Sequence, residues 1–127
     1  MAVLAATGAV LLFASSAIAR TSFPTTITHD GSVPLGDGGT FVDSGHVTSP
    51  RFRCRALRIV TLTGHYPSGR TELLDIDLTS AGGAWATKAD LTGTDRVRAR
   101  ARKYTFGRQG HRKVCRADSV VFPAPAP

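Results

Sequence analysis

The sequence has few of the residues that build metal sites, cofactor sites or helical domains. Its 127 residues include only two cysteines, Cys54 and Cys115. Neither has a second Cys or His at the spacing of two to four residues that is typical of structural zinc sites. No segment beyond residue 20 has the apolar period of an amphipathic helix. We therefore expect no metal, no cofactor and no helical bundle.

The first 19 residues lack charged side chains altogether. They include the apolar run from Val10 to Phe13 and end in Ala17-Ile18-Ala19, the small-residue pattern of a secretory cleavage site. We interpret residues 1–19 as a helical signal peptide that is removed after Ala19, which predicts a secreted, extracellular protein. The alternative is an N-terminal membrane anchor, because an uncharged run of about 18 residues is at the short limit for crossing a bilayer.

Length and cysteine count together predict one small domain with one crosslink. A chain of 127 residues with 42% hydrophobic residues can build a single ordinary core. In an exported chain of this size, two cysteines indicate one disulfide rather than two free thiols. A bridge from Cys54 to Cys115 closes a loop of about 60 residues and is expected to stabilise the fold by about 4 kcal/mol.

The exported part of the sequence is patterned as strands and turns. About seven β-like segments are separated by Gly- or Pro-containing turns, which predicts an all-β sandwich. The clearest strand lies within 55–66, where Val60 and Leu62 share one face. We expect KVCRADSVVF, residues 113–122, to form the last strand, and Trp85 to be a core anchor.

The segment TELLDIDLTS, residues 71–80, alternates apolar and polar residues with a period of two. We expect its apolar residues to point inward and its acidic residues outward. The inward set is Leu74, Ile76 and Leu78, and the outward set is Asp75, Asp77 and Thr79.

Positive charge is concentrated in the C-terminal part of the chain. Residues 51–127 contain 15 of the 16 basic side chains and 6 of the 9 acidic ones. Over residues 96–103 arginines alternate with small apolar residues, so a strand would carry these arginines on one face. A second alternation precedes the strand within 55–66. The candidate polyanion surface is Arg51, Arg53, Arg55, Arg96, Arg98, Arg100, Arg102 and Lys103.

Two interpretations of this surface stay open. Alternating arginines are typical of the solvated face of an antiparallel strand, and on an edge strand they oppose pairing with another copy. If the basic residues converge on one face, they form a surface that attracts wall polymers, polysaccharides or lipid headgroups. Nucleic acid is not the expected partner, because only Tyr104 and Phe106 accompany the arginines and no nucleic-acid-binding motif is present.

Several short motifs follow one another in a recognisable order. They are Gly45-His46-Val47, Cys54, Arg58-Ile59-Val60-Thr61-Leu62, Thr79 through Gly83-Ala84-Trp85, the basic segment Arg96 to Lys103, and Cys115. This order resembles the small Ig-like or transthyretin-like (prealbumin-like) β-sandwich modules of secreted bacterial proteins. The resemblance covers residues 40–122 and implies an antiparallel sandwich of about seven strands, a Cys54–Cys115 bridge and no enzymatic activity. A flexible Thr/Pro/Gly-rich lead, residues 20–39, and a Pro-rich tail, residues 123–127, lie outside it.

Two catalytic alternatives compete with this interpretation. Asp43-Ser44-Gly45 follows two apolar residues, as in the active-site turn of aspartic peptidases, but Asp-Ser-Gly also occurs at plain turns and bulges. Four histidines are candidates for a Ser-His-Asp triad, yet no G-x-S-x-G motif is present. We expect these histidines, at positions 29, 46, 65 and 111, to lie in or beside turns. The sequence therefore predicts a structural or interaction role rather than catalysis.

Overall fold

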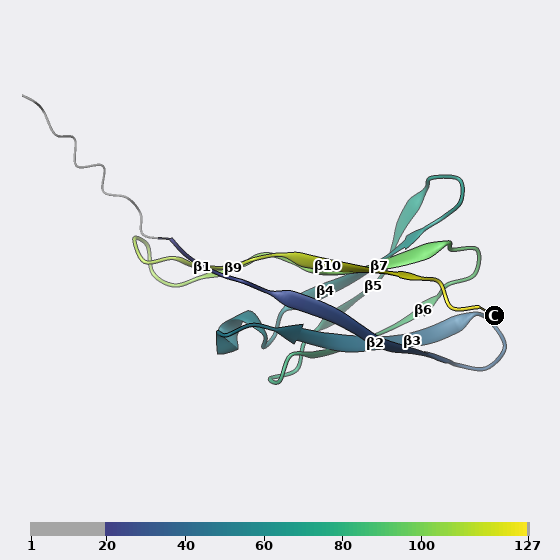
Figure 1. Cartoon of the computed structure of the whole chain (residues 1–127), viewed down its shortest axis with the longest axis horizontal. Coiled ribbons are helices and arrows are strands. Elements are labelled where there is room, and N and C mark those ends of the chain that lie inside the picture. Colours follow the sequence, from purple (N-terminus) through teal and green to yellow (C-terminus); the bar gives the residue numbers. More distant parts are fainter. Residues whose placement is uncertain (1–19, 127) are drawn as a thin grey trace, which may run out of the picture.

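The computed structural model describes residues 20–126 and is all-β (Figure 1). The predicted signal peptide, residues 1–19, lies outside the described residues. Within them there is no α-helix, and the only helical turn is a 3-10 helix, η1 (Phe52–Cys54). The strands are β1 (Thr21–Phe23), β2 (Thr26–Pro34), β3 (Thr40–Thr48), β4 (Ile59–His65), β5 (Thr71–Leu78), β6 (Ala84–Asp90), β7 (Arg96–Ala101), β8 (Tyr104–Phe106), β9 (Lys113–Cys115) and β10 (Asp118–Pro123).

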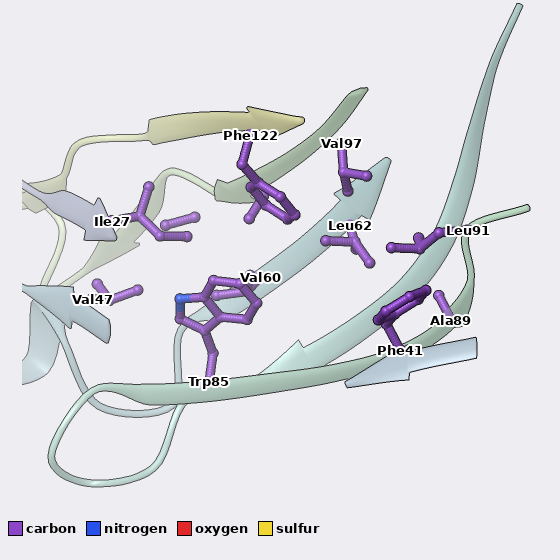
Figure 2. Close-up of a cluster of buried hydrophobic side chains, with 12 residues drawn as sticks. Ile27, Phe41, Val47, Val60, Leu62, Trp85, Ala89, Leu91, Val97 and Phe122 are labelled. Carbon is purple, nitrogen blue, oxygen red and sulfur yellow. The ribbon is translucent and has the colours of Figure 1, made fainter. Parts of the chain in front are cut away.

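Two antiparallel sheets pack face to face around one core, as in a β-sandwich. One sheet has the strand order β10-β7-β4-β5 and the other the order β2-β3-β6. Alternating side chains from both sheets fill the space between them (Figure 2). Trp85 from β6 lies in this core, 2% exposed, and its indole N–H donates to the carbonyl of Thr28 at 3.1 Å.

A third, smaller sheet lies at one end of the molecule, on the left of Figure 1. Its order is β1-β9-β8, and β1 runs parallel to β9. The predicted disulfide is confirmed: Cys54 in η1 is bonded to Cys115 in β9. The bridge therefore fastens the small sheet to the segment that leads into β4.

The strand count is higher than the seven predicted, for two reasons. The expected last strand is divided into β9 and β10, which pair in different sheets. The short strands β1 and β8 are additional, and the expected flexible lead contains all of β2, which pairs with β3 along its whole length apart from one bulge between His29 and Gly31. β-Branched residues in this Thr-rich segment favour an extended backbone, and pairing fixes it in the sheet.

Gly45 lies opposite this bulge but adds no extra residue to β3: His29 pairs with Gly45 and Gly31 with Ser44, so the extra residue belongs to β2, while pairing of Gly45 with β6 is regular. Its lack of a side chain serves a different purpose. A Cβ atom at this position would lie 1.8 Å from the carbonyl oxygen of Thr28 and 2.8 Å from the ring of Trp85. Glycine is therefore required here by close packing rather than by backbone curvature.

The predicted orientation of β5 is wrong after its first residues. Leu74 is an extra residue where the register with β4 shifts between Leu62 and Thr63. Such a bulge reverses the face on which the following residues lie. As a result Leu74 packs against the core, whereas Ile76 and Leu78 are 51% and 57% exposed.

The two acids of β5 point toward the other sheet instead of outward. The carboxylate of Asp77 accepts a hydrogen bond from the backbone N–H of Ala86, and that of Asp75 accepts one from Lys88, each at 2.8 Å. Both N–H groups belong to β6, an edge strand of its sheet. Side-chain carboxylates thus satisfy backbone donors that have no neighbouring strand.

Arg58, just before β4, is buried beside the backbone of the disulfide-bonded Cys54. Its guanidinium, 1% exposed, donates to the carbonyl oxygens of Cys54, Arg102 and Arg116 at 2.5, 2.5 and 3.0 Å, and to the hydroxyl of Thr25 at 3.1 Å. Desolvation by burial lowers the pKa of Arg58 below its ordinary value. Among residues 20–126 no carboxylate forms an ion pair with Arg58, so backbone carbonyl dipoles stabilise the buried charge.

Candidate anion-binding face

The arginines of β7 lie on the solvent side of the four-stranded sheet. Arg96, Arg98 and Arg100 are exposed, while the intervening residues of β7 are fully buried. Because residues two apart on a strand are about 7 Å apart, the guanidinium groups form an evenly spaced row. The alternation expected for this segment is therefore present in the strand.

The position of β7 excludes one of the roles considered for its arginines. β7 pairs with β10 on one side and with β4 on the other. It is an inner strand, so its charges do not protect a free sheet edge from pairing with another copy.

The outer face of this sheet carries no acidic side chain at the positions that pairing places beside the arginines. Arg98 and Arg100 have Thr63 and Thr61 of β4 on one side, and Val121 and Ser119 of β10 on the other. Among the described residues, the only ion pair of a lysine or arginine is Arg70 with Glu72, at 4.0 Å. The arginine row is thus not neutralised by any carboxylate of the described chain.

Aliphatic side chains form a second row on the same face. Thr61 of β4 pairs with Ile76 on one side and with Arg100 on the other. Thr63 of β4 likewise pairs with Leu73 and with Arg98. With strands about 4.8 Å apart, the aliphatic row runs about 10 Å from the arginine row. The sequence did not predict this row, because Ile76 and Leu78 were expected in the core.

The two rows meet at a groove near the start of β4. This groove has a volume of about 360 Å³ and is lined by Leu57, Ile59, Leu78, Arg102, Lys103 and Tyr104. The backbone N–H of Arg102 donates to the carbonyl of Ile59 at 3.0 Å, which extends the pairing of β7 with β4 by one residue. The groove is therefore lined by both aliphatic and cationic side chains.

The second predicted alternation, at Arg51, Arg53 and Arg55, does not form a strand. Backbone hydrogen bonds from Cys54 to Arg51 and from Arg55 to Phe52 close a 3-10 turn instead. This turn places the buried Cys54 next to Cys115, to which it is bonded. The three arginines therefore do not share one face of a strand.

Arg51 and Arg53 nevertheless lie near the groove through aromatic rings. Their guanidinium carbons are 5.9 and 5.2 Å from the ring centre of Phe106, which stacks on Tyr104 at 5.8 Å. Arg55 lies apart from them, over the ring of Phe52. Arg51 and Arg53 are thus connected through Phe106 to Tyr104, which lines the groove, whereas Arg55 is not.

A polar cluster with the residue types of a catalytic triad lies on the other sheet. Nε2 of His29 is 3.0 Å from Oδ1 of Asp43 and 3.2 Å from Oγ of Ser32, and the Ser32 hydroxyl also donates to Oδ1 of Asp43. A triad needs the two ring nitrogens of histidine to contact serine and aspartate separately, whereas here one nitrogen serves both. The arrangement holds β2 against β3 and does not provide a base for the serine.

The histidines do not all lie at turns as expected. His29, His46 and His65 are within strands β2, β3 and β4. The ring of His29 stacks on Phe122 at 3.6 Å, and Nδ1 of His46 is 2.5 Å from the carboxylate of Asp30. That hydrogen bond, followed by one from Thr28, lowers the pKa of Asp30 below its ordinary value of 3.8.

Asp43 is fully buried in the middle of β3, and not in a loop such as holds the aspartate of an aspartic peptidase. A cavity of about 530 Å³ beside the Pro-rich tail is lined by Ser32 and Phe41 but not by Asp43. Within residues 20–126 no group of three His, Cys, Asp or Glu side chains is placed to hold a metal. In the same range no helix is long and apolar enough to span a membrane.

Comparisons with known proteins give no relative from which a role could be transferred. No protein-family model, curated protein or solved structure matches this chain.

Proposed function

We propose that this protein is a secreted, non-catalytic interaction module that binds anionic polymers through the outer face of the β10-β7-β4-β5 sheet. In this proposal its sandwich is of the Ig-like or prealbumin-like kind and its leader is a cleaved signal peptide. One observation carries the function: Arg96, Arg98 and Arg100 lie exposed on a sheet face without acidic side chains.

The spacing of the charges favours a polymeric partner. Three guanidinium groups about 7 Å apart repel one another, and they form no ion pair with a carboxylate of the described chain. A polyanion relieves this repulsion and releases the counterions of both partners, so its affinity falls steeply with salt. Small monovalent anions exchange at single sites and lack this multivalent advantage.

Two further observations support an extracellular setting. The Cys54–Cys115 bridge is of a kind that persists in oxidising compartments and is rare in the cytosol. The net charge of +7 makes a secreted chain attractive to the acidic polymers that surround cells.

The non-catalytic part of the proposal rests on the polar cluster at Asp43. The carboxylate that a peptidase would use is buried, and its oxygen Oδ1 is engaged by Ser32 and His29. If Asp43 has only this structural role, Asp43→Asn changes the stability of the protein, and neither the variant nor the wild type has peptidase activity. Hydrolysis of a peptide library by the wild-type protein and not by Asp43→Asn would contradict it.

Salt-dependent retention on immobilised heparin tests the anion-binding proposal. We expect the wild-type protein to be retained near 150 mM salt and to elute at higher salt, which screens the contacts. Each arginine that is removed from the face should reduce by about one the number of counterions released on binding. The variant Arg98→Gln/Arg100→Gln is expected to elute earlier than the control Arg70→Gln/Lys88→Gln. The control has the same net charge, but its changes lie outside the face. Equal elution of the two variants, or no retention of the wild type, would contradict the proposal.

A further inference from the structure

The aliphatic row of β5, formed by Leu73, Ile76 and Leu78, faces solvent, which is unfavourable for a soluble protein unless the row is covered by a partner. An edge strand in water commonly turns its apolar residues inward and its charges outward. Here the bulge at Leu74 does the reverse: it turns Asp75 and Asp77 toward β6 and places Ile76 and Leu78, 51% and 57% exposed, on the outer face with Leu73, which is 52% exposed. The same face therefore presents aliphatic side chains without any neighbouring acid.

Leu57 extends this aliphatic surface into the lining of the groove. Its side chain is 72% exposed, and its backbone has a φ of 53°, the left-handed region that leucine rarely adopts. Glycine or asparagine would relieve the backbone strain at this position. A strained and exposed leucine beside Ile59 and Leu78 indicates that the side chain itself serves in a contact.

We propose that this face docks on the surface of an anionic lipid bilayer, an inference that rests on the anion binding proposed above. The aliphatic residues Leu57, Leu73, Ile76 and Leu78 enter the boundary between headgroups and acyl chains. Arg98, Arg100 and Arg102 contact the phosphates about 10 Å away along the face. Apolar contact and attraction of arginine to anionic lipids act together in interfacial binding.

Charge decides between a bilayer and the other occupants of an apolar face. A second copy of the chain would bring its own arginine row toward this one, and no acid on the face would compensate. A soluble polysaccharide satisfies the arginines but leaves the aliphatic row in water. A neutral bilayer satisfies the aliphatic row only. Anionic lipid complements both rows.

Co-sedimentation with vesicles, run beside the heparin column, tests the inference. The probes are vesicles of phosphatidylcholine alone and vesicles with about one third phosphatidylglycerol. We expect binding only to the second, with affinity lowered at least tenfold by Ile76→Thr/Leu78→Thr and about fivefold for each arginine of the row that is replaced by Gln. The double threonine variant is expected to keep the heparin retention of the wild type, because it retains every arginine.

The matched control is Val33→Thr/Leu35→Thr. Val33 and Leu35 are also exposed aliphatic residues, but they lie on and just after β2 in the other sheet. Threonine is a β-branched residue of the kind that strands favour, and the far-ultraviolet circular dichroism and thermal midpoint of each variant establish that it is folded. The control is expected to bind anionic vesicles as the wild type does.

The possible outcomes separate this inference from the proposed function. If Ile76→Thr/Leu78→Thr binds anionic vesicles as well as the control does, the bilayer inference is wrong, and heparin retention still supports a purely electrostatic surface. Failure on both vesicles and heparin contradicts both proposals. If sedimentation equilibrium shows a wild-type dimer that the threonine variant loses, the row covers a second copy and the bilayer inference fails.

Discussion

Arg58 holds four parts of the chain together through one buried side chain. Its guanidinium donates to groups in the segment before β2, in η1, after β7 and after β9. In the sequence it is one arginine among four between residues 51 and 58, and its spacing does not distinguish it from its exposed neighbours. The sequence could not reveal its burial, because the carbonyl groups that it contacts come from distant segments.

Replacing Arg58 with Ala is expected to lower the free energy of unfolding by about 3 kcal/mol or more. The variant loses charge-assisted hydrogen bonds and leaves buried carbonyl groups without donors. Arg58→Lys is expected to recover only part of this loss, because an ammonium group does not reproduce the planar fork of donors. Urea unfolding of the three proteins measures the effect, and a loss below about 1 kcal/mol in Arg58→Ala would contradict the assigned role.

Asp30 and His46 form an exposed pair with a consequence for acid stability. The pKa of Asp30 is lowered in the folded state, chiefly by the hydrogen bond with His46. Its contribution to stability is therefore complete above the ordinary pKa of 3.8 and is lost as the pH falls through the lowered value. We expect Asp30→Asn to reduce the difference between urea midpoints at about pH 5 and about pH 3.

The variant His46→Gln tests the cause of that acid sensitivity. It removes the main donor to Asp30, so it is expected to weaken the pH dependence in the same direction, and adding Asp30→Asn is expected to change little further. Independent, additive effects of the two substitutions would show that the pair is not responsible.

At the level of elements, β5 shows why a regular pattern can mislead. Its period of two correctly predicts a strand. It does not reveal the bulge at Leu74, which inverts the faces of the residues that follow. Whether a strand carries a bulge depends on its partner, and the sequence of β5 alone does not contain that information. β7, which is paired regularly on both sides, has the faces that its alternation predicts.

Removing the carboxylates of β5 is expected to expose the edge of β6. In Asp75→Ala/Asp77→Ala the N–H groups of Ala86 and Lys88 lose their acceptors, so their hydrogen exchange should accelerate. We expect stability to fall by about 1–2 kcal/mol, because these hydrogen bonds are partly replaced by bonds to water. The freed edge also favours self-association.

Asp75→Asn/Asp77→Asn is the matched control, because each amide keeps one oxygen that accepts a hydrogen bond. It should retain most of the protection of the Ala86 and Lys88 amides. Wild-type exchange rates at these amides in the alanine variant would show that the carboxylates do not cap the edge.

For the whole molecule, the sequence predicts the fold class and the crosslink better than the arrangement of sheets. The alternation of β7 and the cysteine count each depend on local or compositional signals, and the structure is all-β with the expected bridge. The small β1-β9-β8 sheet brings together segments from both ends of the described chain. Pairing over such a distance has no local signature, and neither does the 3-10 turn at the alternating arginines Arg51, Arg53 and Arg55.

Loss of the disulfide is expected to act on the whole domain. The bridge joins residues 61 apart, so Cys54→Ala/Cys115→Ala should lower the free energy of unfolding by about 4 kcal/mol through the greater entropy of the unfolded chain. Thermal unfolding, compared with that of the wild-type protein with and without reducing agent, measures this. A midpoint that neither reduction nor substitution changes would contradict the role of the bridge.

The central claim is that the outer face of the β10-β7-β4-β5 sheet binds anions. The most direct measurement is a titration of the ¹⁵N-labelled protein with a heparin oligosaccharide, followed by amide chemical shifts. We expect the largest shifts in β7 around Arg98 and Arg100 and in the facing residues of β4 and β10, reversed by added salt. Shifts confined to the β2-β3-β6 sheet, or no shifts at low salt, would contradict the claim.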